Sequence, residues 1–311
     1  MNGVVVVDKP AGITSHDAVE RVRKLLGEKK AGHTGTLDPM ATGVLPVCVG
    51  EATKLASFLA GDDKTYEVTM RLGVRTDTLD MTGRVLDEQE PRVTGADVRA
   101  VLEGFAGAIT QVPPQYSAVK VRGRALYKWA RKGVHLVPPA RQVEIRAIRL
   151  RAFEPPRVRF DVTCSKGTYV RTLCADAGER LGCGAALESL RRTASGRFRL
   201  EDAVSLEGAS DAALRERLER GLIPPARALA GVGDIPVPPP LEEQMRKGRQ
   251  PDAGALAGLQ IPSLAAGDVV QFTSESGRLV ALARMVVATA EIPTLGARDR
   301  VARILRVFAE S

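Results

Sequence analysis

The chain has 311 residues, of which 44% are hydrophobic and 26% charged, and it carries a formal net charge of +8. This composition is typical of a globular protein and excludes a disordered or collagen-like chain. No apolar run approaches the roughly 18 residues that a membrane span requires. The 4 cysteines are far apart and form no C-x-x-C pair, so we expect small buried side chains rather than a zinc site or a disulfide framework.

The N-terminal segment predicts a strand and then a helix. Residues 3–8 form an apolar run without a basic leader before it, so we expect a cytoplasmic protein with no membrane partner. Ser15 stands where the N-cap of an amphipathic helix should be, and Gly27 ends that helix.

The stretch from Ala31 to Gly43 is predicted to be a loop of fixed shape. Its glycines and its proline interrupt both helix and strand. It holds one acid, Asp38, and one histidine, His33. Taken alone, the stretch is typical of a tight turn in which the acid caps backbone donors, but loops on a rigid scaffold also carry catalytic residues.

Strands and helices alternate without regular order through the middle of the chain. Tyr66 falls in a strand predicted over 64–72, on the face of its apolar residues. Thr94 and Asp97 form the N-terminal capping pattern of a helix. The later elements are strands over 142–153, 158–164 and 186–193, with a helix ending at 181 between the last two. This mixture, without βαβ spacing, predicts an α+β domain on a largely antiparallel sheet.

The C-terminal part predicts a second, smaller domain. A helix is expected over 211–220, and the proline-rich run 235–240 is typical of a linker. Short strands over 269–273, 279–287 and 301–308 predict a small β-rich domain from 241 to 311.

Positive charge is concentrated in the middle of the chain. Residues 118–199 hold 19 lysines and arginines against 6 aspartates and glutamates, which suggests contact with a polyanion. Between 116 and 139, basic residues alternate with Tyr116, Tyr127 and Trp129. That combination suits phosphate contacts and the stacking of unpaired bases, but it also fits an ordinary helix with a packed tryptophan.

A series of short motifs in one order resembles the TruB-type tRNA pseudouridine synthases of bacteria over residues 2–230. The motifs are Val7-Asp8-Lys9-Pro10, Gly32 to Gly43, Lys64-Thr65-Tyr66, Arg75-Thr76-Asp77-Thr78, Tyr116-Ser117-Ala118 with Lys120, Ser165 to Thr172, and Leu190-Arg191-Arg192. The resemblance implies a pseudouridine synthase catalytic domain over 1–233, with an RNA-gripping insertion at about 113–141. The tail over 241–311 resembles, less closely, the PUA-like RNA-binding domain of that family.

The resemblance implies an isomerase that acts on the T-loop uridine of tRNA at position 55. The N1-glycosidic bond is broken, the base is turned over and a C5-glycosidic bond is made. No cofactor and no metal are needed, and the sequence offers no phosphate-binding Gly-Lys loop, dinucleotide motif or metal-spaced His/Cys cluster. Because stacking hides the target base, the base must be flipped out, at a cost of about a few kcal/mol.

Three catalytic residues follow from the resemblance. Asp38 is the essential carboxylate, and Arg171 is its ion-pair partner, which keeps the carboxylate ionised and oriented. Tyr66 stacks on the target base, and its hydroxyl is able to move a proton. Whether Asp38 first attacks the ribose, attacks the base or removes a ribose proton stays open.

Further residues are implied at the substrate and along the RNA. His33 acts as a wedge near the extruded nucleotide, Lys9 supports the loop, and Leu190 supplies an apolar wall of the pocket. Tyr169 is a further substrate-binding residue. The residues expected to contact RNA are Lys120, Arg122, Arg124, Lys128, Arg131, Lys132 and Lys166.

The implied partner is tRNA, bound through its T arm by a monomer that needs no guide RNA and no protein partner. A guide-RNA-dependent relative of the dyskerin type is an alternative, disfavoured by the short C-terminal domain. A tRNA-folding chaperone is another, and this activity is compatible with modification in the same protein. A pure RNA-binding module is a third, against which the complete catalytic loop argues.

Overall fold

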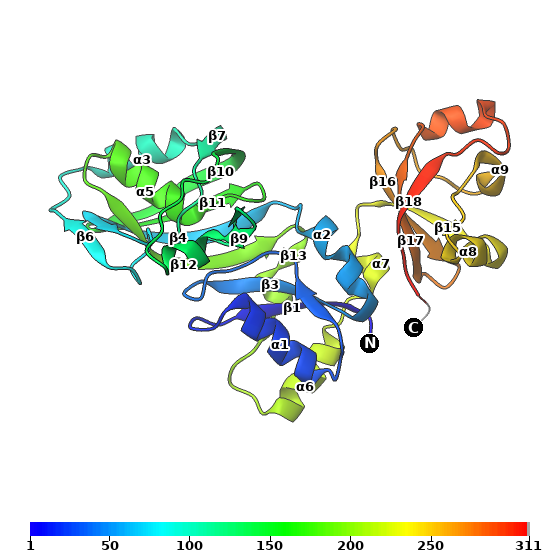
Figure 1. Ribbon diagram of the computed structural model, residues 1–311, viewed down its shortest axis with the longest axis horizontal. Helices are drawn as coiled ribbons and strands as arrows, with labels where there is room; N and C mark the ends of the chain where they lie inside the picture. The colour runs from blue at the N-terminus through cyan, green and yellow to red at the C-terminus, as the bar shows by residue number, and fades with distance from the viewer. Residues whose placement is uncertain (310–311) are drawn as a thin grey trace.

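The computed structural model describes residues 1–309, which form a large part and a small part lying side by side (Figure 1). The large part is built on one sheet. Its strands are β1 (Gly3–Lys9), β2 (Ala31–His33), β3 (Thr42–Val49), β4 (Lys64–Leu72), β7 (Gly107–Gln111), β10 (Arg141–Glu154), β11 (Arg157–Cys164), β12 (Ala185–Ser195), β13 (Phe198–Arg199) and β14 (Val204–Ser205).

The strands of this sheet follow the order β14-β1-β3-β12-β4-β11-β10-β7, with β2 on β3 and β13 on β12. Most neighbours are antiparallel, whereas β14 on β1 and β12 on β3 are parallel. The expected α+β fold on a largely antiparallel mixed sheet is confirmed. The late strand β12 lies between β3 and β4 and therefore joins the two halves of the sheet.

Helices pack against the large sheet and against the small sheet. The α-helices are α1 (Ser15–Leu25), α2 (Ala56–Leu59), α3 (Gly95–Glu103), α4 (Leu126–Ala130), α5 (Val170–Arg180), α6 (Asp211–Arg220), α7 (Pro225–Ala228), α8 (Pro239–Arg246) and α9 (Ala253–Leu256). The 3-10 helices are η1 (Gly50–Leu55), η2 (Leu200–Asp202) and η3 (Thr289–Thr294). No helix within residues 1–309 is long and apolar enough to cross a membrane.

The start of α1 differs from the prediction by one residue. Thr14, not Ser15, is the N-cap: its hydroxyl accepts a hydrogen bond from the Asp17 amide, and the Asp17 carboxylate accepts one from the Thr14 amide. Ser15 Oγ is instead bonded to the backbone of Leu37. The predicted capping of α3 by Thr94 and Asp97 is confirmed.

The expected loop from Ala31 to Gly43 is partly wrong. Residues 31–33 pair with β3 as β2, and β3 already begins at Thr42. The segment that remains outside the strands is 34–41, which we call the Asp38 loop. Backbone pairing on both sides therefore fixes the two ends of this loop.

The expected linker at 235–240 is also wrong. Residues Gly233–Val237 form β15, parallel to β16 (Val269–Ser274), and the small sheet continues with β17 (Leu279–Met285) and β18 (Ala302–Val307). Pro236 is tolerated because β15 is an edge strand. Pro239 and Pro240 occupy the first turn of α8, where a missing amide costs nothing. The last residues of the predicted small domain, 310–311, lie outside the described residues.

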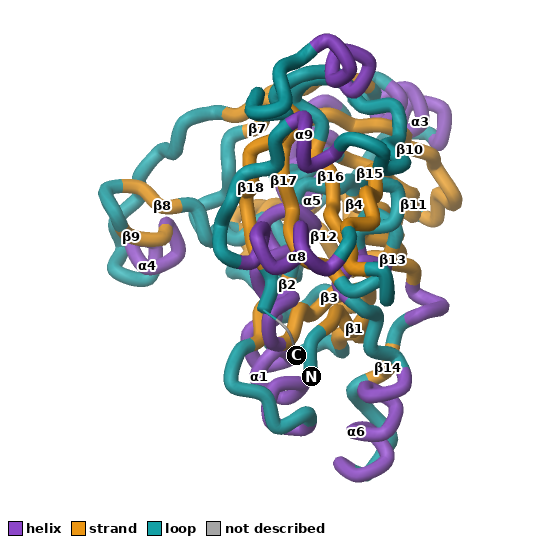
Figure 2. The backbone as a smooth tube through the Cα atoms, turned by 90° about the vertical axis from the view of Figure 1, so that its right-hand side faces the viewer, coloured by secondary structure: helices purple, strands orange, loops and turns teal. Residues whose placement is uncertain are grey.

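Two short hairpins stand apart from these sheets. One pairs β5 (Val74–Thr76) with β6 (Val85–Glu88), and the other pairs β8 (Lys120–Val121) with β9 (Arg124–Ala125). The segment 113–141, which we call the arm, carries the second hairpin and α4 and projects from the body of the large part (Figure 2).

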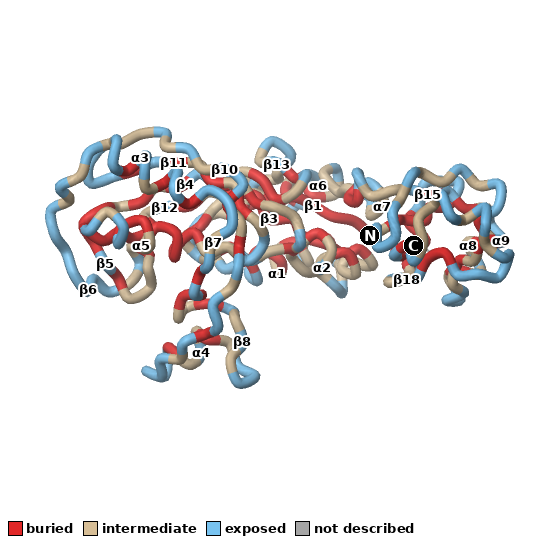
Figure 3. The backbone as a smooth tube through the Cα atoms, turned by 90° about the horizontal axis from the view of Figure 1, so that it is seen from above, coloured by how far each residue is buried: buried red, intermediate tan, exposed pale blue. Residues whose placement is uncertain are grey.

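Figure 3 shows that buried backbone runs through the strands of both parts, whereas the arm stands clear of them. One apolar cluster lies between the large sheet and the helices packed on it and includes Tyr66 and Leu190. A second cluster continues from β1 and β3 into the small part through Leu279, Leu282 and Phe308. The two parts therefore share a core. The cysteines are buried and free of disulfides, as expected.

Candidate active site

The Asp38 loop is held by side chains on both flanks. Ser15 Oγ accepts a hydrogen bond from the amide of Leu37 at 2.8 Å and donates one to its carbonyl at 3.0 Å. The buried Lys9 Nζ donates to the carbonyl oxygens of Pro39, Pro10 and Ile13. Burial lowers the pKa of Lys9 to about 8, although the charge of Asp38 opposes this fall. Lys9 thus supports the loop, as expected.

Asp38 and Arg171 form the expected ion pair. Arg171 Nε lies 2.8 Å from Asp38 Oδ2, and Nη2 lies 3.1 Å from Oδ1, so that two parallel contacts fix the carboxylate. Arg171 is 5% exposed, whereas the Asp38 side chain keeps 33% of its surface exposed. The carboxylate is therefore oriented from behind and open in front.

The pKa of Asp38 is raised above its ordinary value. Burial is the main cause, the Arg171 charge opposes it, and the nearby carboxylate of Asp80 adds to the rise. Arg171 limits this rise rather than reversing it, and Lys9 acts in the same direction as Arg171. An ionised Asp38 is thus a more basic carboxylate than one at the surface.

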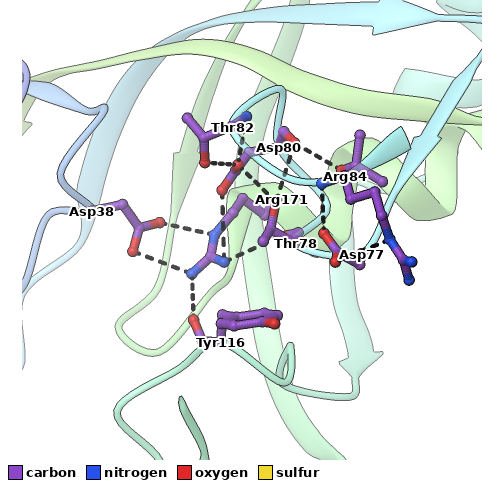
Figure 4. A network of polar contacts seen from close by, with 9 residues as sticks. Asp38, Asp77, Thr78, Asp80, Thr82, Arg84, Tyr116 and Arg171 are labelled. Carbon is purple, nitrogen blue, oxygen red and sulfur yellow. Dashed lines mark hydrogen bonds and ion pairs between the residues drawn. The ribbon is translucent and has the colours of Figure 1, made fainter. Parts of the chain in front are cut away.

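Arg171 connects three segments of the chain around Asp38 (Figure 4). Beyond its ion pair, it donates to the carbonyl oxygens of Thr78 and Tyr116, and its Nη1 lies 3.8 Å from Asp80 Oδ2. Tyr116 is at the root of the arm. The guanidinium therefore joins the Asp38 carboxylate to the segment expected to grip RNA.

Sequence reasoning missed Asp80. This residue is buried, and its Oδ1 accepts hydrogen bonds from Thr78 Oγ1, Thr82 N and Thr82 Oγ1. The Thr-x-Asp-x-Thr spacing in the loop after β5 was the available signal. Asp80 holds its own loop together and presents its second oxygen to Arg171.

Tyr66 lies on β4 with its side chain in the core, 8% exposed. Its predicted position on the apolar face of that strand is confirmed. Burial raises the pKa of the Tyr66 hydroxyl, the Arg192 charge opposes this rise, and the Asp38 charge adds to it. The Tyr66 hydroxyl is thus protonated at neutral pH.

His33 lies on β2, half-buried, and its Nδ1 has no hydrogen-bond partner within the described part of the chain. Burial and the charge of Arg192 lower its pKa, which keeps the imidazole neutral. A neutral ring of this kind is compatible with the expected wedge.

The other two expected substrate residues lie on neighbouring elements. Leu190 is buried on β12 opposite Val68 of β4. Tyr169 is the N-cap of α5, two residues before Arg171, and its backbone exchanges two hydrogen bonds with the side chain of Gln111. No hydrogen bond joins Tyr169 to Asp38 within residues 1–309.

The arm presents its basic residues to solvent. Six of its seven lysines and arginines are exposed, and none of the six has a carboxylate partner among residues 1–309: Lys120, Arg122, Arg124, Lys128, Arg131 and Lys132. Arg124 lies over the ring of Trp129 and Arg131 over that of Tyr127. Two of the arm's aromatic rings are thus already covered by arginines. Lys166 is exposed on the turn before α5.

Three arginines of β10 and β11 are neutralised by acids, in contrast to the basic residues of the arm. Arg151 pairs with Asp161, Arg157 with Glu188 and Arg159 with Glu154. The arm therefore keeps positive charge that is free for phosphate groups, whereas these three arginines do not.

A cavity of about 790 Å³ opens beside β4, β11 and β12. Its walls include Met40, Thr42 and Leu190 but neither Asp38 nor Tyr66, so it adjoins the site without containing the carboxylate. Within residues 1–309, no cluster of three or more His, Cys, Asp or Glu side chains is placed to hold a metal ion.

Two family models match the chain. The N-terminal domain of TruB family pseudouridylate synthases matches residues 23–170, and the C-terminal domain of tRNA pseudouridylate synthase B matches residues 171–230. Together with the mixed sheet and the loop that carries Asp38, these matches define the class of the protein, which is a pseudouridine synthase.

Relatives narrow the class to a family. The tRNA pseudouridine synthase B of Syntrophus aciditrophicus is 50% identical over 99% of this chain and 99% of its own length. That of Thiobacillus denitrificans is 45% identical over 94% of this chain and 97% of its own length. The chain belongs to the TruB family, and its reaction is the isomerisation of uridine to pseudouridine in tRNA.

Solved structures agree on the architecture. A chain of a Cbf5-Nop10-Gar1 complex covers 99% of this chain and 85% of its own length, at 28% identity and a TM-score of 0.76. A chain of an H/ACA RNP bound to a substrate RNA containing 2′-deoxyuridine also reaches a TM-score of 0.76, at 25% identity. The chain thus combines a pseudouridine synthase sheet with a PUA-like C-terminal domain.

Proposed function

We propose that the chain modifies the T-loop uridine of tRNA at position 55, with Asp38 as the essential carboxylate. The observation that carries this proposal is the Asp38–Arg171 pair, in which an oriented carboxylate faces outward at the root of a basic arm. The same ionised oxygen is needed whether Asp38 attacks the ribose, attacks the base or removes a ribose proton. The proposal therefore does not depend on the order of steps.

Tyr66 and the substrate residues complete the proposed site. The Tyr66 ring stacks on the flipped base, and its hydroxyl moves the proton that leaves C5 when the base regains aromaticity. His33 fills the space that the extruded nucleotide vacates, and Leu190 and Tyr169 form walls. Support for this comes from the burial of Tyr66 beside the carboxylate and the neutral state of His33.

The arm, together with Lys166, is proposed to contact the phosphates of the T arm. Six exposed cations without carboxylate partners among residues 1–309 support this assignment, because unneutralised Lys and Arg release counterions when they meet phosphates. We further propose a catalytic domain up to about residue 233 and a second domain beyond it that also contacts RNA.

The chain is proposed to act as a monomer in the cytoplasm, on tRNA alone. The relatives named tRNA pseudouridine synthase B over nearly the full chain support action without guide RNA. The structural similarity to complexes of Cbf5 supports a shared fold.

The test uses the purified full chain with an unmodified tRNA transcript and, separately, a T-arm minihelix. Mass mapping is expected to find pseudouridine at the T-loop uridine in both RNAs without a guide RNA. Modification at another position, or a requirement for added guide RNA or protein, would contradict the proposal. Light scattering of the chain, free and with tRNA, tests whether the chain is a monomer.

A further inference from the structure

Arg192 is a buried cation that the proposed mechanism does not use. Its side chain is 1% exposed and is among the largest that are fully buried. No carboxylate lies within ion-pair distance of its guanidinium in the described part of the chain. Because a buried unpaired charge is costly, a guanidinium at this position needs a reason.

The guanidinium is bonded to backbone next to the Asp38 loop. Nε donates to the carbonyl of Val44 at 2.6 Å, and Nη2 donates to the carbonyl of Gly35 at 3.0 Å. Gly35 is within the loop itself, three residues before Asp38. Arg192 therefore ties the loop to the first residues of β3.

Close approach of the backbone reinforces this tie. A Cβ atom on Gly43, whose φ is +100°, would lie 2.2 Å from the carbonyl oxygen of Arg192. Only glycine permits this distance. The segments on both sides of Asp38 are thus packed against one residue of β12.

Arg192 also faces the tyrosine of the site. It is the cross-strand neighbour of Tyr66 in the β12–β4 pairing. Burial raises the pKa of the Tyr66 hydroxyl, and the charge and hydrogen bonding of Arg192 oppose that rise. One residue therefore bonds to the loop of the carboxylate and lies opposite Tyr66 on the neighbouring strand.

We propose that Arg192 is a positioning residue for pseudouridine formation, which holds the Tyr66 hydroxyl in register with the Asp38 loop. The inference rests on the proposed function, since it acts through Tyr66. A purely structural arginine would stabilise the loop but would not couple to the tyrosine hydroxyl. Arginine is suited to this role because its planar guanidinium donates to several acceptors at once, whereas a lysine ammonium on a flexible side chain does not hold them in one geometry.

The experiment is a double-mutant cycle on the full chain. Single-turnover rates of pseudouridine formation in tRNA transcript are measured for the wild type, Arg192→Lys, Tyr66→Phe and the double variant, with thermal melting and tRNA affinity for each. The matched control is Arg191→Lys, because Arg191 directly precedes Arg192 on β12 but is partly exposed and pairs with Asp8.

Arg192→Lys is expected to fold, to bind tRNA within a few-fold of the wild type and to react at least tenfold more slowly. In the Tyr66→Phe background the same change is expected to slow the reaction less than twofold. Arg191→Lys should stay within twofold of the wild type.

An Arg192→Lys variant at the wild-type rate, or an equal slowing with and without the Tyr66 hydroxyl, would overturn the inference. If Arg192→Lys unfolds, Arg192→Gln takes its place in the cycle. If both variants unfold, Arg192 has only a structural role, and the inference is overturned. A wild type that forms no pseudouridine refutes the proposed function instead, which separates the two failures.

Discussion

Asp38 and Arg171 are separated by 133 residues in the chain, yet they share two hydrogen-bonded contacts. Such a pair orients the acid, because two contacts leave a carboxylate no freedom to rotate. Its raised pKa also gives the acid a stronger affinity for a proton than a surface carboxylate has. Orientation and basicity thus come from the same buried surroundings.

Replacing Asp38 by asparagine should abolish pseudouridine formation, because the amide keeps the shape of the carboxylate but neither its charge nor its basicity. The affinity for tRNA should remain within a few-fold of the wild type. Mass mapping measures the product, and filter binding measures the affinity. A loss of binding in proportion to the loss of activity would make Asp38 a structural residue.

Replacing Asp80 by asparagine should shift the pH dependence of the rate. Activity requires ionised Asp38, so the rate falls as pH falls through the pKa of Asp38. The Asp80 charge raises that pKa, and its removal should therefore move the acidic limb of the single-turnover rate to lower pH. Asp77→Asn is the control, because Asp77 belongs to the same loop and binds the Arg84 amide instead. If the acidic limb of the rate stays at the same pH in Asp80→Asn, the Asp80 charge does not raise the pKa of Asp38.

The motifs of the sequence were sufficient to predict the Asp38–Arg171 contact but not its surroundings. Asp80 and Arg192 escaped prediction for one physical reason: charged residues are expected at the surface, and nothing local marks the ones that the fold buries. The partners of Arg192 are carbonyl oxygens, which every residue carries, so no side-chain pattern announces them.

At the scale of elements, the arm differs from the strands in how its charge is compensated. The hairpin of β8 and β9 turns through Arg122 and Gly123, both with positive φ, the backbone that a two-residue turn requires. The turn projects cations into solvent, whereas Arg151 of β10 and Arg159 of β11 pair with acids across the sheet. Net charge along the sequence did not distinguish these two cases.

The double variant Lys120→Gln and Lys128→Gln should weaken tRNA binding and flatten its salt dependence. Each lost phosphate contact lowers the slope of log affinity against log salt by about one. Arg159→Gln is the matched control, since Arg159 is already paired with Glu154, and its slope should equal that of the wild type. Titrations at several salt concentrations measure the slopes, and a double variant with the wild-type slope would remove these lysines from the RNA surface.

Prolines explain where element prediction failed. Alternation was sufficient to place Tyr66 and its strand correctly, because side chains of a half-buried strand repeat every second residue. The proline-rich composition of the run from Ile235 to Pro240 predicts a linker, and proline also lacks the amide for a strand ladder. An edge strand and a helical first turn both tolerate that lack, and only tertiary pairing reveals them.

For the whole molecule, the shared core fixes the small part to the large one. Phe308 is 2% exposed and packs in the cluster that joins the parts. Lys54 of the large part lies over its ring and donates to the carbonyl of Val307. The proposed active-site residues all lie in the large part, so we expect the contact between the two parts to affect RNA binding more than chemistry.

Replacing Phe308 by alanine should destabilise the contact between the large and small parts by about 3–5 kcal/mol, the usual cost of removing a buried phenylalanine. Calorimetry should show an earlier transition for the small part, while the rate at saturating tRNA stays near that of the wild type. Val286→Ala removes a side chain that is 45% exposed and should leave the transition unchanged. A single unshifted transition in Phe308→Ala would show that the two parts do not depend on this contact.

The position of β12 between β3 and β4 has a consequence for synthesis on the ribosome. Both neighbouring strands are made long before residues 185–195 emerge, so the growing chain carries two open strand edges until β12 is made. Open edges invite pairing with other chains, and long-range strand pairing is slow. A nascent chain that stops before β12 is therefore expected to need protection by chaperones.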